Sequence, residues 1–372
     1  MSRPVHGGNL AWAAQLARCA PAELLDFSAS ISPLGPPRSV REAIQAAFSW
    51  VVAYPDTAYG ALRGAIAQHH NISPDYVLPG NGAADLLTWA ARDVSERSRQ
   101  CFLAAPNFSD YDRALKAFGC RFSKIDLLNQ EGWHLADWEA TFFTSMPKEA
   151  RLHKSSFLLN NPHNPTGALL DRQRVRSLLC AFKTVVVDEA FMDFLPPEHE
   201  QSVIDWVDEF PGLVVLRSLT KFYSMPGVRL GYAIAQPDTL KRWQQWRDPW
   251  AVNSLAAAAG VAAIQDVDFQ RQTWDWLAVA NAELFAGLSA LPDLSPLPSC
   301  ANFFLVGCAV SATALQAALL KRHRIYIRDC MSFEQLGDRY FRVAVKSHAD
   351  NQCLLAALAD TLPSLEKVHL VL

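Results

Sequence analysis

The sequence predicts an α/β protein with a mainly parallel central sheet covered by helices, followed by a second, smaller α/β unit. In the first part of the chain, short apolar runs rich in β-branched residues recur, and each precedes a polar or glycine-containing turn and a helical pattern. Such alternation is typical of parallel sheets with helices on both faces. After about residue 235, long helical stretches and then three further strand-like runs replace this pattern, which predicts the smaller unit.

Four runs in the first part are expected to be strands buried on both faces, because they are almost continuously apolar. They are "CFLAA" (101–105), "SFLLN" (156–160), "TVVVDEA" (184–190) and "LVVLR" (213–217). In the smaller unit the expected strands are "NFFLVG" (302–307), "RIYIRD" (324–329) and "YFRVAV" (340–345), with a helix near 311–323. Ligands of parallel sheets bind beyond the carboxyl ends of the strands, so the polar residues there are the first candidates for chemistry.

Composition narrows the classes of partner. The formal charge of −3 over 372 residues gives no electrostatic attraction for nucleic acid or an anionic membrane, which leaves small molecules as the expected partners. The eight cysteines form no C-x-x-C pair, so we expect no metal site and a reducing compartment. The longest nearly apolar run, 254–264, is too short to span a membrane. We therefore expect a cytoplasmic protein.

Polar motifs follow the predicted strands. "NNPHNPTG" (160–167) is a rigid turn that can fix Asn164, and "DEAF" places Asp188 at the tip of a central strand. "SLTKFYSMPGVRLGY" (218–232) contains Lys221 close to a predicted strand end. "LPGNGAADLLTWAA" (78–91) is a glycine turn that opens into a helix, whose first backbone N–H groups can hold a phosphate.

These features match the requirements of pyridoxal 5′-phosphate. This cofactor needs a lysine for covalent attachment, an acid against its pyridine nitrogen, and donors for its phosphate. A carboxylate beside the pyridine nitrogen keeps that nitrogen protonated, because an opposite charge favours the charged form. Asp188 fits the acid and Lys221 fits the lysine.

The ordered motifs N-P-x-N-P-T-G, D-E-A-F and S-x-T-K-x-x-x-x-x-G-x-R-x-G resemble those of fold-type I pyridoxal-phosphate enzymes of the aspartate aminotransferase superfamily. The resemblance covers nearly the whole chain. It implies a large domain whose mainly parallel, seven-stranded sheet lies between helices. It also implies an N-terminal arm with part of the small domain (1–45), a large cofactor-binding domain (46–250) and a C-terminal small domain (251–372).

The resemblance implies roles for the matching residues. Lys221 would hold the cofactor as a Schiff base and then act as proton donor or base, while Asp188 would pair with the pyridine nitrogen. The other cofactor contacts would come from Asn164 at the ring hydroxyl, Phe108 on the ring face, and Ser218, Arg229, Ala83 and Ala84 at the phosphate. Phe191 stands where many relatives have a tyrosine, so one donor to the ring hydroxyl is lost.

Tyr54, in "AYPD", resembles the tyrosine that reaches the cofactor phosphate of the neighbouring subunit. The resemblance therefore implies a homodimer whose two subunits share their active sites.

The N-terminal stretches "HGGNLAWAAQLA" and "LLDFSASISPLGPP" resemble those of the L-threonine-O-3-phosphate decarboxylase family, a close relative of the histidinol-phosphate aminotransferases. This family makes aminopropanol phosphate for the nucleotide loop of cobalamin. Arg342 would hold the substrate carboxylate, since its planar fork gives two parallel hydrogen bonds. Arg328, His6 and Gly7 would anchor the substrate phosphate, and Ser30 and Asn164 would complete the substrate contacts.

Several alternatives stay open at this point. No motif displays which bond at the substrate Cα breaks, so an aminotransferase acting on histidinol phosphate or a related phosphorylated amine is the second reading. Ser30 and Ser32 replace two asparagines of the decarboxylase family, which leaves serine phosphate or a larger ester open as substrates. Two further alternatives are a cofactor-binding protein without catalysis and a nucleotide-binding enzyme that uses "GNG" as its phosphate loop.

Overall fold

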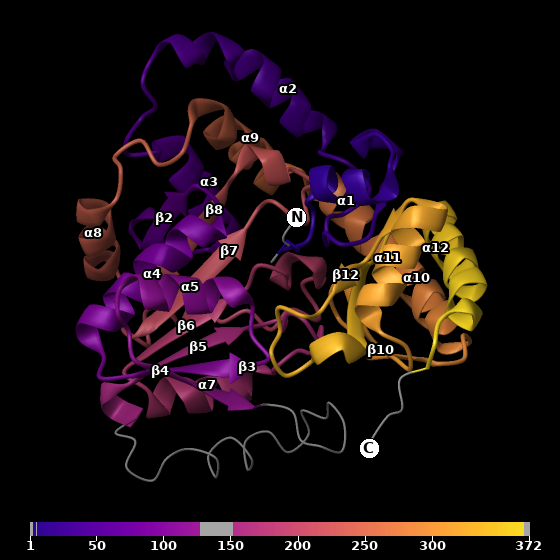
Figure 1. The fold of residues 1–372 in the computed structure, drawn as a ribbon. Coiled ribbons are helices and arrows are strands. Elements are labelled where there is room, and N and C mark those ends of the chain that lie inside the picture. The colour runs from indigo at the N-terminus through magenta and orange to yellow at the C-terminus, as the bar shows by residue number, and fades with distance from the viewer. Residues whose placement is uncertain (1–2, 5, 127–151, 368–372) are drawn as a thin grey trace. The chain divides into compact units, whose positions relative to one another are not determined.

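The computed structural model describes residues 3–4, 6–126 and 152–367. The chain divides into two compact units, and each is described by itself. The first unit comprises Met1–Pro33, Pro165–Ala168 and Trp274–Leu372, and the second comprises Leu34–Asn164 and Leu169–Thr273. The domain bounds expected from the sequence, 1–45, 46–250 and 251–372, stay a prediction. Figure 1 shows the course of the chain.

The second unit contains a seven-stranded sheet, which confirms the predicted mainly parallel architecture. Its strand order is β2 (Val77–Gly80), β8 (Gly231–Ala235), β7 (Leu213–Ser218), β6 (Thr184–Asp188), β5 (Ser156–Asn160), β3 (Cys101–Ala105) and β4 (Phe122–Asp126). Strand β8 is antiparallel to both of its neighbours, and the other pairs are parallel. Every residue of β3, β5, β6 and β7 is buried, as their continuously apolar runs predicted.

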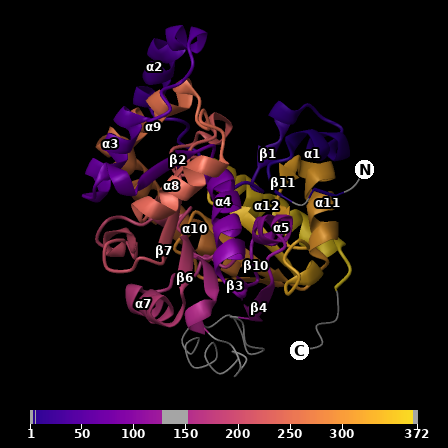
Figure 2. The same ribbon diagram turned by 90° about the vertical axis from the view of Figure 1, so that its left-hand side faces the viewer.

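Helices cover both faces of this sheet (Figures 1 and 2). The helices of the unit are α2 (Arg38–Ala47), α3 (Gly60–His70), α4 (Ala83–Arg97), α5 (Ser109–Ala117), α7 (Arg172–Ala181), α8 (Pro237–Trp246) and α9 (Ser254–Gln265). Side chains of α4, α5 and α8 share one apolar core with alternate residues of the strands, such as Leu103 and Val186. On the other face, Phe102 and Phe157 pack against Phe182 at the end of α7. Because successive side chains of a strand point to opposite faces, each strand contributes to the apolar cores on both faces of the sheet.

The first unit contains a four-stranded antiparallel sheet and a two-stranded parallel one. The larger has the order β12 (Arg328–Asp329), β13 (Tyr340–Ala344), β10 (Phe303–Cys308) and β9 (Leu294–Pro296), and the smaller pairs β1 (Leu25–Asp26) with β11 (Ile325–Tyr326). Its helices are α1 (Leu10–Ala17), α11 (Ala312–His323) and α12 (His348–Thr361); α10 (Val267–Ser289) runs through the boundary between the units. The run "RIYIRD", expected as one strand, is divided because β11 pairs with β1 whereas β12 pairs with β13.

Short 3-10 helices connect many of these elements. They are η1 (Pro21–Glu23), η2 (Phe48–Val52), η3 (Pro74–Tyr76), η5 (Leu152–Lys154), η6 (Met192–Phe194), η7 (Ile204–Trp206), η8 (Pro226–Val228), η9 (Gly337–Arg339) and η10 (Leu362–Ser364). Across the described part of the chain, no helix has the length and hydropathy needed to cross a membrane.

Candidate active site

The tips of the central strands carry the residues that we call the strand-tip cluster: Asn164, Asp188, Ser218 and Lys221. Asp188 ends β6 and is only 8% exposed. Its Oδ2 accepts a hydrogen bond from the Tyr111 hydroxyl at 2.7 Å, and its Oδ1 accepts one from the backbone of Ala190 at 3.0 Å. Burial raises the pKa of the Asp188 carboxyl, whereas the Tyr111 hydroxyl and the charge of Lys221 lower it. The carboxyl is therefore held where a cation on a ligand would stabilise its ionised form.

Lys221 stands three residues beyond the end of β7. Its Nζ donates to Ser218 Oγ at 3.3 Å, and Ser218 Oγ shares a second hydrogen bond with the Thr220 hydroxyl at 2.7 Å. The amine also lies 5.0 Å from the centre of the Phe191 ring, over the face of that side chain. The half-buried amine of Lys221 therefore lies near the carboxylate of Asp188 at the tip of β6.

The loop after β5 is tied to the tip of β6. The Asn160 side chain donates to the backbone carbonyl of Asp188 at 2.7 Å and accepts from the backbone N–H of Asn164 at 2.7 Å. Asn161 makes two further hydrogen bonds, with the N–H and the carbonyl of Leu170. Asn164 is consequently buried, 8% exposed, in a loop whose backbone has little freedom.

The start of α4 approaches the ends of β7 and β8 closely. A Cβ on Gly231 would lie 2.8 Å from the backbone nitrogen of Ala83 and 2.6 Å from the Arg217 carbonyl, so only glycine fits there. Gly82 has a φ of +80°, and a Cβ on it would lie 2.4 Å from the Arg229 guanidinium. Gly82 is the N-cap residue of α4 and has no side chain that could cap the helix. The backbone N–H groups of Ala83 and Ala84 lie in the first turn of α4, close to Arg229. This arrangement suits an anion such as phosphate.

Phe108, immediately before α5, and Tyr111, within α5, lie next to the cluster. Their rings meet edge to face, with centroids 5.9 Å apart. Burial raises the pKa of the Tyr111 hydroxyl well above its usual value, so this hydroxyl remains a donor to Asp188. Tyr111 was not among the residues expected from the sequence, although it stands only three positions after Phe108.

Tyr54 lies outside this set of contacts. Its side chain is 81% exposed, and its ring stacks on Trp250 at a centroid distance of 4.7 Å. The structure therefore brings together all the predicted cofactor residues except Tyr54, whose expected role involves another subunit.

The predicted substrate residues of the first unit centre on two arginines. Arg328 on β12 and Arg342 on β13 are direct partners in the antiparallel register, and they are 3% and 9% exposed. Burial lowers the pKa of Arg342 to about 10, with a further lowering from Arg328, so Arg342 remains charged at neutral pH. Like charges directly opposite each other in a sheet are destabilising. A bound anion would offset this repulsion, which indicates an anion site.

The other predicted substrate residues differ in exposure. His6 is exposed, and Gly7 is half-buried, where a Cβ would lie 2.2 Å from the carbonyl oxygen of Ser28. Arg342 donates to the same carbonyl at 3.4 Å, so Gly7 and Arg342 share a neighbour. Ser30 is 5% exposed, and its hydroxyl has no hydrogen-bond partner among residues 3–4, 6–126 and 152–367. A buried hydroxyl of this kind is available to a ligand.

A network of buried charges lies one residue away from Asp188 and Ser218, and the sequence analysis missed it. Arg217 precedes Ser218 and is 1% exposed. It donates to Glu189 at 2.9 Å, to Glu200 at 2.6 Å, and to Asp193. Burial raises the pKa of Glu189 to about 7, although Arg217 opposes this shift. An arginine at the end of an otherwise apolar strand was the signal for this network.

Comparisons with known proteins show the family to which the chain belongs. The family described as "Aminotransferase class I and II" matches residues 22–358. Threonine-phosphate decarboxylase of Salmonella typhimurium is 38% identical over 96% of both chains, and histidinol-phosphate aminotransferase 2 of Ralstonia nicotianae is 31% identical over 93% of this chain and 90% of its own. The structure is also similar to that of histidinol-phosphate aminotransferase from Sinorhizobium meliloti in complex with pyridoxal-5′-phosphate. Its TM-score is 0.82 at 23% identity, over 98% of this chain and 96% of that one.

We predict that Arg217→Ala lowers the free energy of unfolding by about 3–5 kcal/mol, because it leaves buried carboxylates without their cation. Urea unfolding monitored by circular dichroism measures this change. Arg271→Ala is the control, since Arg271 and its partner Asp268 have side chains that are 70% and 89% exposed, and it should change stability much less. Equal effects of the two substitutions would show that the network does not stabilise the strand tips.

Proposed function

Because the chain belongs to the family of class I and class II aminotransferases, we propose that it is a pyridoxal-phosphate-dependent decarboxylase of L-threonine O-3-phosphate. The product is (R)-1-aminopropan-2-yl phosphate, which the resemblance assigns to the nucleotide loop of cobalamin. The observation that carries the proposal is the opposed pair Arg328 and Arg342, both buried, in a chain that also has the strand-tip cluster. A phosphorylated amino acid has one anionic group for each arginine.

The residues of the second unit fit pyridoxal phosphate. Lys221 would hold it covalently, and Asp188, whose pKa is raised by burial, would gain a cationic partner in the pyridine nitrogen. Asn164 would bond the ring hydroxyl, and Phe108 would cover the ring. Ser218, Arg229 and the backbone N–H groups of Ala83 and Ala84 would hold the phosphate at the uncapped start of α4.

The proposed substrate-binding residues orient the substrate. Arg342 binds the substrate carboxylate with two parallel, charge-assisted hydrogen bonds, and Arg328 binds the phosphate together with His6 and Gly7. Ser30 supplies its otherwise unbonded hydroxyl to the substrate. With the substrate held at both anionic ends, rotation about its Cα bonds is limited, so one chosen bond can be presented for cleavage.

Decarboxylation replaces the carboxylate on the substrate Cα with a hydrogen. When bound, pyridoxal phosphate supplies an electron sink for the pair released as the bond from Cα to the carboxylate breaks. Lys221 then gives a proton to Cα, so the substrate loses carbon dioxide and gains one hydrogen. Tyr111 keeps Asp188 in place through its hydrogen bond during these steps. No oxidant or second substrate is required.

A transaminase acting on histidinol phosphate or a related phosphorylated amine is the second candidate. The 31% identity to histidinol-phosphate aminotransferase 2 of Ralstonia nicotianae favours it. Such an enzyme would use the same arginines for phosphate and for the carboxylate of its keto acid, but it would break the bond from Cα to hydrogen.

We predict that the purified protein loaded with pyridoxal phosphate releases carbon dioxide from L-threonine O-3-phosphate without any keto acid. Lys221→Ala should lower kcat at least about 1,000-fold, because both covalent attachment and proton transfer are lost. Carbon dioxide release is followed with a coupled assay, and glutamate is measured in parallel with histidinol phosphate and 2-oxoglutarate. Glutamate formation without carbon dioxide release would support the second candidate and exclude the first.

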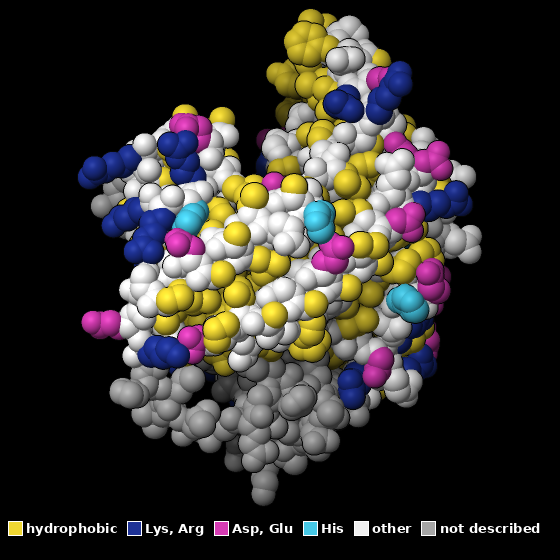
Figure 3. Space-filling view, turned by 90° about the vertical axis from the view of Figure 1, so that its right-hand side faces the viewer, with side chains coloured by type: hydrophobic (Ala, Val, Ile, Leu, Met, Phe, Trp, Pro, Cys, Tyr) yellow, Lys and Arg dark blue, Asp and Glu magenta, His cyan; other side chains and the backbone are white. Residues whose placement is uncertain are grey.

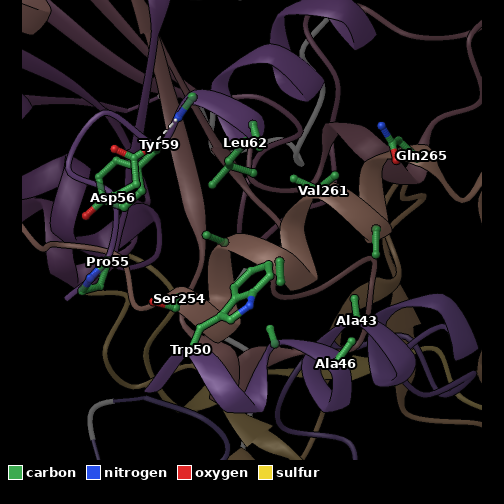
Figure 4. Close-up of a pocket in the computed structure, with 16 residues that line it drawn as sticks. Ala43, Ala46, Trp50, Pro55, Asp56, Tyr59, Leu62, Ser254, Val261 and Gln265 are labelled. Carbon is green, nitrogen blue, oxygen red and sulfur yellow. Dashed lines mark hydrogen bonds between the residues drawn. The ribbon is translucent and has the colours of Figure 1, made fainter. Parts of the chain in front are cut away.

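We also propose that the enzyme works as a homodimer. Large apolar side chains are exposed between α2 and α3 and before α9, namely Phe48, Trp50, Val51, Val52, Tyr54 and Trp250. Figure 3 shows hydrophobic side chains gathered over the end of the molecule where α2 lies. Beside them, a pocket of about 450 Å³ is lined by Trp50, Tyr59 and small residues of α2 and α9 (Figure 4). A contiguous apolar surface of this kind is typical of a subunit interface.

A second copy of the chain is the occupant that best fits this surface. The patch combines protruding aromatic and aliphatic side chains with a pocket, and a two-fold interface requires both on the same surface. Tyr54 lies within the patch, so the same contact would bring it to the cofactor phosphate of the partner subunit. We place this dimer in the cytoplasm, because the eight cysteines lack the paired spacing of disulfide or zinc motifs.

We predict that Val52→Asp converts the dimer into monomers and lowers activity in parallel, since a buried charge at an interface is costly. Val52 is 91% exposed in the single chain. Val279→Asp, at a 60% exposed valine of α10, is the matched control and should leave the dimer intact. Sedimentation velocity gives the oligomeric state. A wild-type monomer, or a Val52→Asp dimer with full activity, would contradict the proposal.

A further inference from the structure

The turn that follows β1 is held firmly within the first unit. Strand β1 pairs with β11, and the next residue, Phe27, continues the contact by donating to the Tyr326 carbonyl at 2.8 Å. The Phe27 carbonyl accepts from the backbone of Ala344, at the end of β13, at 2.9 Å. Ser28, which follows, is completely buried. The position of Ser28 is therefore fixed by strands on both sides.

Asp26 orients the hydroxyl of Ser28. One carboxylate oxygen of Asp26 accepts from the Ser28 hydroxyl at 2.6 Å and from the Ser28 backbone N–H at 2.7 Å. With its proton directed at Asp26, the hydroxyl presents a lone pair to the N–H of Gly8, which donates to it at 2.7 Å. A hydroxyl oxygen becomes a stronger acceptor for a second donor when its own proton is already hydrogen-bonded to a carboxylate.

The carbonyl of Ser28 faces two predicted substrate residues. It accepts from Arg342 at 3.4 Å, and Gly7 packs against it so closely that a Cβ would lie at 2.2 Å. Ser28 thus contacts the N-terminal segment through its hydroxyl and through its carbonyl, and Arg342 through the same carbonyl.

Two further described contacts of the N-terminal segment involve arginines. Arg328 donates to the Pro4 carbonyl at 3.3 Å, and Arg3 approaches Asp329 at 3.6 Å with 40% of its side chain exposed. Exposed ion pairs of this kind contribute little. The short contacts of Gly7 and Gly8 with Ser28 attach the segment beside the two arginines.

We propose that Ser28, oriented by Asp26, is a positioning residue that holds the Gly7–Gly8 segment and Arg342 in one fixed arrangement for the substrate. The proposal rests on the function proposed above, since it concerns the same substrate site. Ser28 touches no reacting atom. Its loss weakens the grip on the anionic ends of the substrate. Arg342 and the cofactor residues are themselves retained, so substrate that has bound reacts at nearly the same rate.

The first test is a steady-state comparison of holoenzymes with L-threonine O-3-phosphate. Ser28→Ala should raise KM about tenfold, which corresponds to the loss of one well-placed hydrogen bond, and should change kcat less than about twofold. The visible absorption of the bound cofactor should stay the same. Asp26→Ala should behave similarly, whereas Asp26→Asn keeps an accepting oxygen and should retain a KM within about threefold of wild type. An unchanged KM, or a fall in kcat alone, would overturn the proposal.

A matched control removes a similar serine–aspartate contact elsewhere in the same unit. The Ser311 hydroxyl donates to Asp338 at 2.5 Å and caps α11 by accepting from Ala314, and neither partner belongs to the N-terminal segment. Ser311→Ala should lower thermal stability without raising KM. If it raises KM as much as Ser28→Ala does, the effect is one of general stability, and the positioning role is wrong.

Hydrogen exchange followed by mass spectrometry tests the attachment without any turnover. The amide of Gly8 should exchange at least about fivefold faster in Ser28→Ala than in wild type. Gly7→Ala, a change in a partly exposed segment that leaves the core intact, should have the same effect by pushing the segment from the Ser28 carbonyl. Unchanged exchange in both variants would refute the attachment. If wild type turns over no phosphorylated substrate, the proposed function fails, while this exchange result still decides whether Ser28 holds the Gly7–Gly8 segment.

Discussion

The parallel register of β5, β6 and β7 is the constraint on which the rest of the site depends. It places Asn160 opposite Asp188, and Asp188 opposite Leu216, so that polar residues leave three neighbouring strands at one edge. A slip of one residue would turn Asp188 to the opposite face, because side chains alternate along a strand. Arg217 and Glu189 oppose such a slip, since their buried ion pair joins the ends of β6 and β7.

The first unit meets a different requirement. Two buried arginines lie in direct register, and like charges so placed are destabilising. An anionic ligand would offset this repulsion. The strand-tip cluster has the acid, amine and amide that pyridoxal phosphate requires, and the arginines are cations that can bind anionic groups. This chain is similar both to a threonine-phosphate decarboxylase and to a histidinol-phosphate aminotransferase, and we propose that the orientation of the substrate selects the bond that breaks.

Part of this site could be predicted from the sequence because its residues follow strands or open a helix. Asp188 and Lys221 were identified in that way, whereas the number of strands in the sheet came from the resemblance to fold-type I enzymes. Tyr111 was missed because its partner is 77 positions away, and only the packing of α5 on the sheet reveals the contact. The roles of Arg217 and Ser28 likewise depend on segments that meet only in the folded chain. Short-range sequence patterns locate the ends of strands. They do not show which side chains from distant segments contact the site residues in the folded chain.

The reaction assigned to this site has a direct isotopic signature. If Lys221 returns a proton to Cα after carbon dioxide leaves, turnover of L-threonine O-3-phosphate in heavy water must place one deuterium on the carbon that lost its carboxylate. Mass spectrometry and proton magnetic resonance of the aminopropanol phosphate measure this incorporation. The account predicts one deuterium per product molecule at that carbon. A product without deuterium there, or a keto product formed with transfer of the amino group, would contradict it.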